Sequence, residues 1–249
     1  MAALVAVLSC WLAAGLAMLS PTAPALGVGT LLQARERLGL QAFVAGTPAC
    51  PTRAQRCFGI VVHVVVEDGA PVQTPRWFAD QLAAANGLFA TIGVGFEATA
   101  VRQEPAAFAE LATRIERDSL GRGAHDPHVV HVWVVRRLGD VDIAGEEIRG
   151  VHWRDRAEPT RRFVILSSIA GSRTLAHELG HFFGLPHSSF PVSIMNKTPR
   201  EEPPWAERGF HPREYATMRT RTGAMIADGT LGDRPARQAR PLPVVGAED

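Results

Sequence analysis

The feature that most constrains this 249-residue chain is the run T-L-A-H-E-L-G-H-F-F-G-L-P-H, which extends from Thr174 to His187. It contains the pattern H-E-x-x-H-x-x-G-x-x-H, in which three imidazoles and one carboxylate stand at fixed spacings. Met195 follows the last histidine by eight positions, within the segment S-I-M-N. The chain therefore has to fold so that this run can gather its histidines around one point.

The spacing of the histidines predicts a zinc site. Residues four apart lie on one face of a helix, so His177 and His181 can offer ring nitrogens to a single ion. Gly184 can take the left-handed conformation that ends the helix, and Pro186 discourages the helix from resuming. His187 can then turn back as the third ligand. Three protein ligands leave a fourth position open, which is typical of a catalytic zinc site and not of a structural one.

Glu178 stands beside the first histidine and is predicted to be the general base, which takes the proton of water and passes it to the leaving amine. We expect the helix to have its N-cap at Ser172. The opposite side of the helix is predicted to be buried, because its apolar residues follow the i, i+4, i+7, i+8 rhythm. These residues are Leu175, Leu179, Phe182 and Phe183.

On these motifs the sequence resembles the metzincin zinc metalloendopeptidases, and the segment from His187 to Pro191 with its distance to Met195 is most similar to the matrixin branch. The resemblance implies that His177, His181 and His187 bind zinc, that Glu178 is the catalytic base, and that Met195 forms a hydrophobic floor under the metal. Met195 can equally be read as a core side chain without a special role, and the two readings are compatible.

The chain departs from that family pattern in two places. Astacin- and serralysin-like members carry a tyrosine two positions after the methionine, whereas this chain has Lys197. We therefore expect no tyrosine to reach the metal. The latency motif of matrixins, Arg-Cys-Gly-x-Pro-Asp, does not occur upstream of the run.

The order of predicted elements indicates an α+β domain with a twisted, mixed five-stranded sheet. Two long helices lie above the cleft, and an irregular C-terminal subdomain ends in a further helix. The resemblance implies a metzincin-like arrangement of these parts. The predicted strands are Ile60–Val66, Gly95–Val101, Val129–Val135, Ile148–Trp153 and Arg162–Ser167. The predicted helices begin after Thr74-Pro75, span the histidine run, and extend from Phe210 to about Ile226.

The predicted strand before the last one is short, polar and contains glycine, as the edge of a sheet tends to be. By the family resemblance this edge lines the cleft and binds the substrate backbone. The residues expected to bind substrate are Arg149, Gly150, Val151, His152 and Trp153.

A pocket for the residue just after the cut is expected between Thr174–His177 and Asn196–Trp205, with the turn Pro199–Pro204 as the far wall. Most of this lining is neutral or apolar, so we expect an apolar substrate residue there. That expectation assumes that the charged residues of the segment point to solvent. An acidic preference would mean that Lys197 or Arg200 lines the pocket.

The ends of the chain suggest further segments. Residues 1–25 are apolar, and the first charged residue is Arg35, which predicts a secretory signal peptide or an uncleaved N-terminal membrane anchor. The protein is then secreted, or anchored facing outward. Residues 26–58 form an N-terminal segment that could be a short pro-segment, and the metzincin-like catalytic domain is expected at 59–227. Residues 228–249 are rich in Gly, Pro, Arg and Ala and are expected to be disordered.

Removal of a signal peptide would leave only two cysteines, Cys50 and Cys57. In an oxidising compartment they would form a disulfide. Two other states stay open from the sequence, namely free thiols and a thiolate that caps the zinc in a latent form.

Other polar residues do not suggest further metal sites. His63 lies within a β-branched run and is predicted to be a hydrogen-bonded core histidine. His125, His128 and His131 extend from a loop into a strand, so their spacing does not place them on one face. Calcium could bind among Asp140, Asp142, Glu146 and Glu147, but no calcium-loop signature supports it.

The composition narrows the partners. The net charge of +1 gives no general field for nucleic acid or a membrane surface. We expect a monomer that acts on a peptide or protein substrate. The main hypothesis is a secreted zinc endopeptidase, and the alternatives are a zinc hydrolase of a non-protein amide and a catalytically silent binding protein on the same fold. The presence of Glu178 argues against the silent protein.

Overall fold

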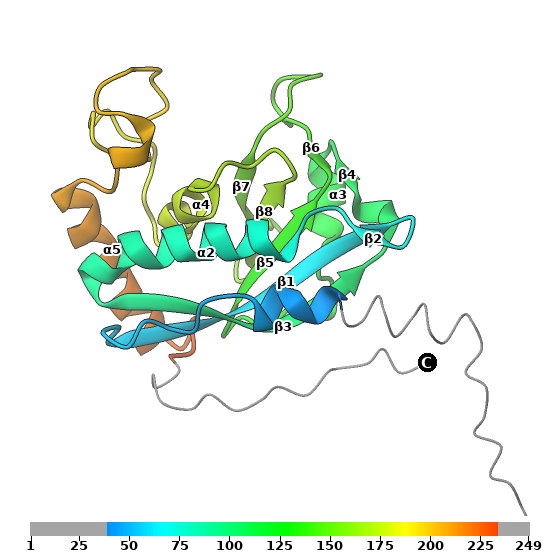
Figure 1. Cartoon of the computed structure of the whole chain (residues 1–249), viewed down its shortest axis with the longest axis horizontal. Helices are drawn as coiled ribbons and strands as arrows, with labels where there is room; N and C mark the ends of the chain where they lie inside the picture. The colour runs from blue at the N-terminus through cyan, green and yellow to red at the C-terminus, as the bar shows by residue number, and fades with distance from the viewer. Residues whose placement is uncertain (1–38, 234–249) are drawn as a thin grey trace, which may run out of the picture.

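Five long strands form one mixed sheet in the computed structural model, which describes residues 39–233 (Figure 1). Four strands are parallel, and the one at the far edge is antiparallel to its neighbour. A sixth, two-residue strand, β2 (Ala70–Pro71), pairs with the end of β1. The five strands, in spatial order, are β3 (Val94–Glu104), β1 (Arg56–Glu67), β5 (Val130–Val135), β8 (Arg162–Ser167) and β7 (Gly150–Arg154). The expected α+β fold with five main strands is confirmed.

The central strands are continuous apolar runs because both faces of the sheet are covered. In β1 the side chains of Ile60, Val62 and Val64 belong to one hydrophobic cluster, whereas Val65 belongs to another. All six residues of β5 and all six of β8 are buried. In β7 only Trp153 is buried, as expected for a strand at the edge.

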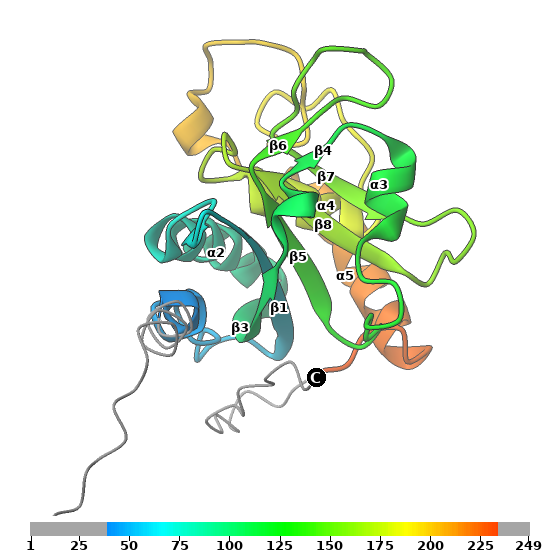
Figure 2. The ribbon, with the colours of Figure 1, turned by 90° about the vertical axis from the view of Figure 1, so that its right-hand side faces the viewer.

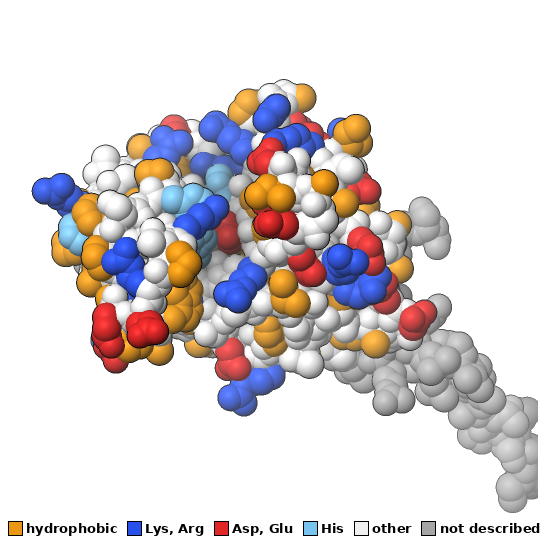
Figure 3. All heavy atoms as spheres, turned by 90° about the horizontal axis from the view of Figure 1, so that it is seen from above, with side chains coloured by type: hydrophobic (Ala, Val, Ile, Leu, Met, Phe, Trp, Pro, Cys, Tyr) orange, Lys and Arg blue, Asp and Glu red, His pale blue; other side chains and the backbone are white. Residues whose placement is uncertain are grey.

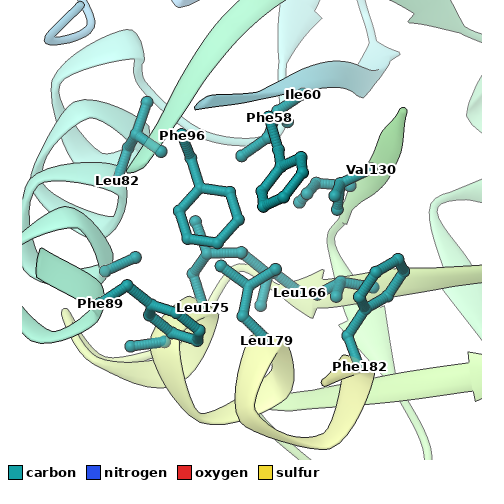
Figure 4. Packing of buried hydrophobic residues seen from close by; sticks show 14 of the residues in the cluster. Phe58, Ile60, Leu82, Phe89, Phe96, Val130, Leu166, Leu175, Leu179 and Phe182 are labelled. Carbon is teal, nitrogen blue, oxygen red and sulfur yellow. The ribbon is translucent and has the colours of Figure 1, made fainter. Parts of the chain in front are cut away.

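Two helices cover the face of the sheet that carries the larger cluster: α2 (Pro75–Phe89) and α4 (Thr174–Phe182). The expected cap of α2 is confirmed, since the Thr74 side chain accepts a hydrogen bond from the Trp77 N–H. Between α2, α4 and the sheet, aromatic and aliphatic side chains point toward one another (Figure 4). The aromatic centre of this core consists of Phe58, Phe89, Phe96, Phe183 and Phe210.

A small layer that was not expected covers the other face of the sheet. It contains α3 (Arg114–Ser119) and a separate two-stranded sheet of β4 (Glu110–Leu111) and β6 (Arg137–Leu138). Figure 2 shows α2 and α3 on opposite sides of the main sheet. The strands of this layer are only two residues long, which is too short to produce a recognisable pattern in the sequence. Short 3₁₀ helices complete the connections at Ala90–Ile92, Ala106–Phe108 and Trp205–Glu207.

The C-terminal part below α4 is irregular until α5 (Pro212–Ala227), so the expected last helix is confirmed. Its N-terminus has a capping box made by His211 and Glu214, and Met218 and Met225 are buried. The tail was expected to be disordered from residue 228. However, Leu231 is packed in the core, and Asp233 accepts a hydrogen bond from the Cys57 N–H.

The N-terminal segment also contributes to the packing. A helical segment at 39–45 buries Leu40 and Phe43, and β1 begins three residues before the expected start of the domain. The expected signal or anchor, Cys10 and the tail from 234 to 249 lie outside the described residues. Within residues 39–233, no helix is both long and apolar enough to cross a bilayer.

Cys50 and Cys57 form a disulfide, with their Cα atoms 6.1 Å apart. The bond joins the loop before β1 to the start of that strand. Its sulfur lies close to β3, because a Cβ at Gly95 would lie 2.9 Å from the Cys50 Sγ and 2.7 Å from Pro51. Only a glycine fits under the loop at this position. Of the three states left open by the sequence, the structure contains the disulfide.

We expect the double variant Cys50→Ser, Cys57→Ser to fold with a lower free energy of unfolding. Closing so short a loop reduces the entropy of the unfolded chain, which corresponds to about 2.5 kcal/mol on the chain-entropy model. Urea denaturation of the parent and of the variant measures the difference. The parent denatured under reducing conditions serves as the control and should match the variant. An unchanged midpoint in both comparisons would show that the bond does not stabilise the fold.

Candidate metal centre and cleft

The three histidines of the run come together in space. His177 and His181 extend from α4, and His187 extends from the loop that follows it. One nitrogen from each ring lies within 4.8 Å of the others, and the Nε2 atoms of His181 and His187 are 3.1 Å apart. Within residues 39–233 no other histidines, cysteines or carboxylates form such a group. The helical spacing of four and the glycine turn therefore produce the predicted cluster, which can bind a metal such as zinc.

The other ring nitrogen of two of these histidines has a fixed partner. The Nδ1 of His177 donates to the Ile194 carbonyl at 2.7 Å, and the Nδ1 of His181 donates to the Leu185 carbonyl at 2.7 Å. These bonds fix the tautomer and the orientation of each ring. Backbone carbonyls commonly hold metal-binding histidines in this way. The Nε2 lone pairs are left to face the centre of the cluster.

The protonation states fit a cation at this centre. Burial lowers the pKa of His177 to about 4 and that of His187 to about 4, and burial also lowers the pKa of His181. All three rings are therefore neutral at physiological pH, as metal ligands must be. The Nε2 atoms of His181 and His187 are 3.1 Å apart, close enough for both to bind one cation. Three neutral imidazoles are a donor set that suits zinc.

The end of the helix agrees with the prediction, but its start does not. Gly184 has a φ of +90° in the left-handed region, and the Leu185 N–H returns to the Gly180 carbonyl. The helix begins at Thr174 and not after Ser172, so the predicted N-cap was wrong. Gln81 of α2 instead accepts the Leu175 N–H at 3.0 Å. A partner so distant in the chain cannot be found from local sequence.

Met195 packs directly against α4. It is fully buried, and a Cβ at Gly180 would lie 2.8 Å from its Sδ. The glycine within the histidine run is thus needed for this close approach. Two further residues hold the turn: the Ser193 hydroxyl accepts the Met195 N–H at 2.9 Å and donates to Glu214 of α5 at 2.7 Å. Sequence reasoning missed Ser193 and Glu214, although the spacing from His211 to Glu214 is that of a capping box.

Glu178 is buried beside the histidines, with 5 % of its surface exposed. Its Oε2 accepts the His152 N–H of β7 at 2.7 Å. Burial raises the pKa of Glu178 to about 8, while the bond from His152 and the positive charge of Lys197 oppose the shift. Among the described residues, Oε1 has no hydrogen-bond partner and is not sealed from solvent. The carboxylate is thus held at one oxygen and open at the other.

Gly150 lets β7 approach α4. A Cβ at this position would lie 2.7 Å from the Thr174 Cγ2 and 3.1 Å from the Glu178 Cγ. Since His152 is two residues further along the strand, this approach is what brings its N–H to the carboxylate. The sequence named Gly150 as a substrate residue but gave no reason to connect it with Glu178.

A cleft of about 920 Å³ runs along β7 and past the histidine cluster. All five residues expected to bind substrate, Arg149, Gly150, Val151, His152 and Trp153, line it. They are not equivalent, however. Val151 and Trp153 pack toward α3, with the Arg117 guanidinium 4.9 Å from the Trp153 ring centre, whereas the His152 N–H is turned away from β8.

The far wall of the cleft differs from the prediction. Asn196, Lys197 and Trp205 line it, but residues 199–204 do not. Arg173, at the start of α4, donates to the backbone carbonyls of Ala206 and Arg208 and so fixes the wall to the active helix. The proline-rich turn lies outside the cleft lining, and Arg208 donates to its Pro203 and Arg200 carbonyls.

His63 is the hydrogen-bonded core histidine that the sequence predicts. His63 is buried, with its Nδ1 2.6 Å from Glu104 and its Nε2 2.8 Å from His131. Burial lowers the pKa of both His63 and His131 to about 3, so they form a neutral core network. In the loop considered for calcium, Asp142 pairs with Arg114, and Asp140 accepts the N–H of Asp142. These carboxylates have protein partners.

The solved structures that are similar to this chain include two bacterial proteins. No family model and no curated protein matches the sequence. Metalloproteinase-II from Bacteroides fragilis aligns over 70 % of this chain with a TM-score of 0.47 and 13 % identity, and the chain spans 56 % of that structure. A promirolysin mutant from Tannerella forsythia aligns over 83 % of this chain and 94 % of its own, also with a TM-score of 0.47 and 13 % identity. Similarity at this level leaves the chemistry to be judged from the site itself.

Replacing His181 by Ala should remove most of the bound zinc. The loss of a direct ligand should exceed the roughly 10- to 100-fold loss of affinity that follows removal of an outer-shell partner. Metal analysis after dialysis, with a competing chelator, measures the affinity. His128→Ala is the matched control, because this histidine is exposed and lies outside the cluster. Full zinc content in the His181 variant would exclude the three-histidine site.

Proposed function

We propose that this protein is a zinc-dependent endopeptidase of the metzincin type, closest to the matrixin-like branch. The observation that carries the proposal is the position of Glu178, buried beside three converging histidines and bonded to the edge strand of the sheet. A carboxylate, a metal-binding cluster and an open strand edge are the three parts that a zinc endopeptidase can use to hydrolyse a bound peptide. Here they meet in one cleft.

His177, His181 and His187 would hold the metal, and Met195 would support the cluster from below by packing on α4. A zinc ion held there would act as a Lewis acid and lower the pKa of a water molecule to about 7. The carbonyls of Ile194 and Leu185 orient two of the ligand rings. The protein thus supplies both the ligands and the groups that aim them.

Glu178 would act as general base. Its Oε2 is fixed by His152, so its Oε1 can receive the proton of the attacking water. A carboxyl group with a raised pKa is a better proton acceptor and holds the proton until the leaving amine takes it. A bound dication would lower this pKa again, toward the range in which the group is ionised at neutral pH.

The edge strand favours an extended peptide over a small amide as substrate. An edge offers backbone N–H and C=O groups that can pair with a peptide main chain. Gly150 and His152 lie where β7 passes Glu178, so a peptide added there would cross the catalytic carboxylate. A non-protein amide would use none of this edge. No feature of the described residues favours the silent binding protein.

We further propose that the enzyme is exported. The Cys50–Cys57 disulfide is consistent with an oxidising compartment. In this proposal residues 1–25 serve as the signal or anchor, and the catalytic domain acts outside the cell on peptide or protein substrates.

Glu178→Gln should keep zinc and fold but lose about 10²- to 10⁴-fold in kcat, because the amide cannot accept the proton of water. The amide oxygen can still accept the His152 N–H, so the local structure should persist. Turnover of a peptide library by the parent and the variant, with zinc content measured in parallel, tests this. Glu201→Gln is the control, since Glu201 is exposed and does not line the cleft. Parent-like turnover by the Glu178 variant would require a different base.

Gly150→Ala should lower kcat while zinc binding persists. The added methyl group meets Thr174 and Glu178, so β7 must move away from α4 and the His152 N–H must leave the carboxylate. The matched control is Gly123→Ala, which does not line the cleft and whose added Cβ would have no atom within 4 Å, although its φ of +78° adds local strain. Kinetics with zinc analysis compare the two. An equal decrease in kcat in both variants would indicate that the substitutions destabilise the fold in general.

A further inference from the structure

Two cations line the cleft near the histidine cluster. Arg149 immediately precedes β7, and Lys197 follows the Met195 turn on the far wall. Both side chains are exposed. Within residues 39–233, neither side chain has a hydrogen bond or an ion pair, whereas Arg114 on the same cleft pairs with Asp142 at 2.5 Å. Arg149 and Lys197 are therefore available to a ligand.

The cleft lining contains four cationic side chains, Arg114, Arg117, Arg149 and Lys197, and three carboxylates, Asp140, Asp142 and Glu178. Asp142 pairs with Arg114, and Asp140 accepts the N–H groups of Asp142 and Ile143. Glu178 accepts the His152 N–H. Figure 3 shows this hollowed face, with histidine side chains on its wall and Lys or Arg side chains around it. The cations of the lining thus outnumber its carboxylates by four to three, and Arg149 and Lys197 are the two cations whose side chains have no protein partner among residues 39–233.

The position of Lys197 is fixed by its neighbours. The buried Asn196 side chain donates to the Phe190 carbonyl at 3.0 Å and accepts the Thr198 N–H at 2.8 Å. The backbone on both sides of Lys197 is therefore held. Lys197 lines the same cleft as His177, His181 and His187.

We propose that Lys197 and Arg149 bind a carboxylate of the substrate just after the scissile bond. This inference rests on the proposed peptidase function and names its substrate class. It replaces the expectation of an apolar residue there, which assumed that Lys197 points to solvent. The carboxylate can come from an acidic side chain or from the C-terminus of the substrate chain, because both offer the same two oxygens.

The test uses peptides with a single cleavable bond. Three C-terminally amidated peptides carry Asp, Asn or Leu after that bond. A fourth has Asn there as its last residue, with a free C-terminus. We expect kcat/KM for the Asp peptide to exceed that for the Asn peptide about tenfold, as a charge-assisted hydrogen bond typically gives. The excess should shrink at high ionic strength, since exposed charges are screened.

Variants test whether Lys197 and Arg149 cause the preference for Asp over Asn. Lys197→Glu should reverse it, so that a peptide with Lys after the bond becomes better than the Asp peptide. Arg149→Gln should reduce the ratio of kcat/KM for the Asp peptide to kcat/KM for the Asn peptide. Arg219→Gln is the control: Arg219 is an exposed cation of α5 outside the cleft, and the ratio should stay unchanged.

The outcomes separate the two proposals. If the zinc-loaded parent cuts none of the peptides and no member of a peptide library, the peptidase function fails. If it cuts peptides but the Leu peptide is preferred, and Lys197→Glu leaves the Asp-to-Asn ratio unchanged, only the carboxylate proposal is overturned. A preference confined to the free C-terminus supports carboxylate binding and identifies its source as the chain end.

Discussion

The close approach of β7 to α4 is the contact on which the candidate site depends. Gly150 has no side chain, so the edge strand can lie against Thr174 and Glu178. On the opposite side of the helix, Gly180 gives Met195 the same freedom. Helix α4 is thus held between a strand edge and a turn, with its N-terminus bonded to Gln81 of α2. Three segments distant in sequence fix one helix, and the histidines move only if these contacts move.

Burying so many polar groups is costly unless each has a partner, and the fold supplies these partners from its backbone. The carbonyls of Ile194 and Leu185 accept hydrogen bonds from the ring N–H groups of His177 and His181. The backbone N–H of His152 donates to the carboxylate of Glu178. The segments that offer these groups are irregular, so they need their own support. Glu214 and Arg173 provide it through hydrogen bonds to Ser193 and to the 206–208 segment. The irregular C-terminal part is therefore fixed by charged side chains bonded to other segments.

Local patterns were sufficient to predict the five main strands and the histidine cluster. A β-branched run such as 60–66 has to be buried on both faces, and a spacing of four places two histidines on one side of a helix. The features that the sequence did not predict depend on contacts between residues that are distant in the chain. The cap at Leu175 comes from Gln81, and Leu231 is drawn into the core from a segment whose composition resembles a disordered tail. The Asn196 side chain holds the backbone on both sides of Lys197, and no sequence periodicity predicts these bonds.

In the proposed enzyme, Lys197 would connect substrate binding with the chemistry of Glu178. Burial raises the pKa of Glu178, and the charge of Lys197 opposes that rise. A peptide bound along β7, as proposed, would exclude water from the cleft, and both effects on the carboxylate would become stronger. A substrate carboxylate bound to Lys197 would cancel part of the opposing charge, and the pKa of Glu178 would then rise. The base would become a stronger proton acceptor when the preferred substrate is in place, which couples substrate recognition to proton transfer through one exposed side chain.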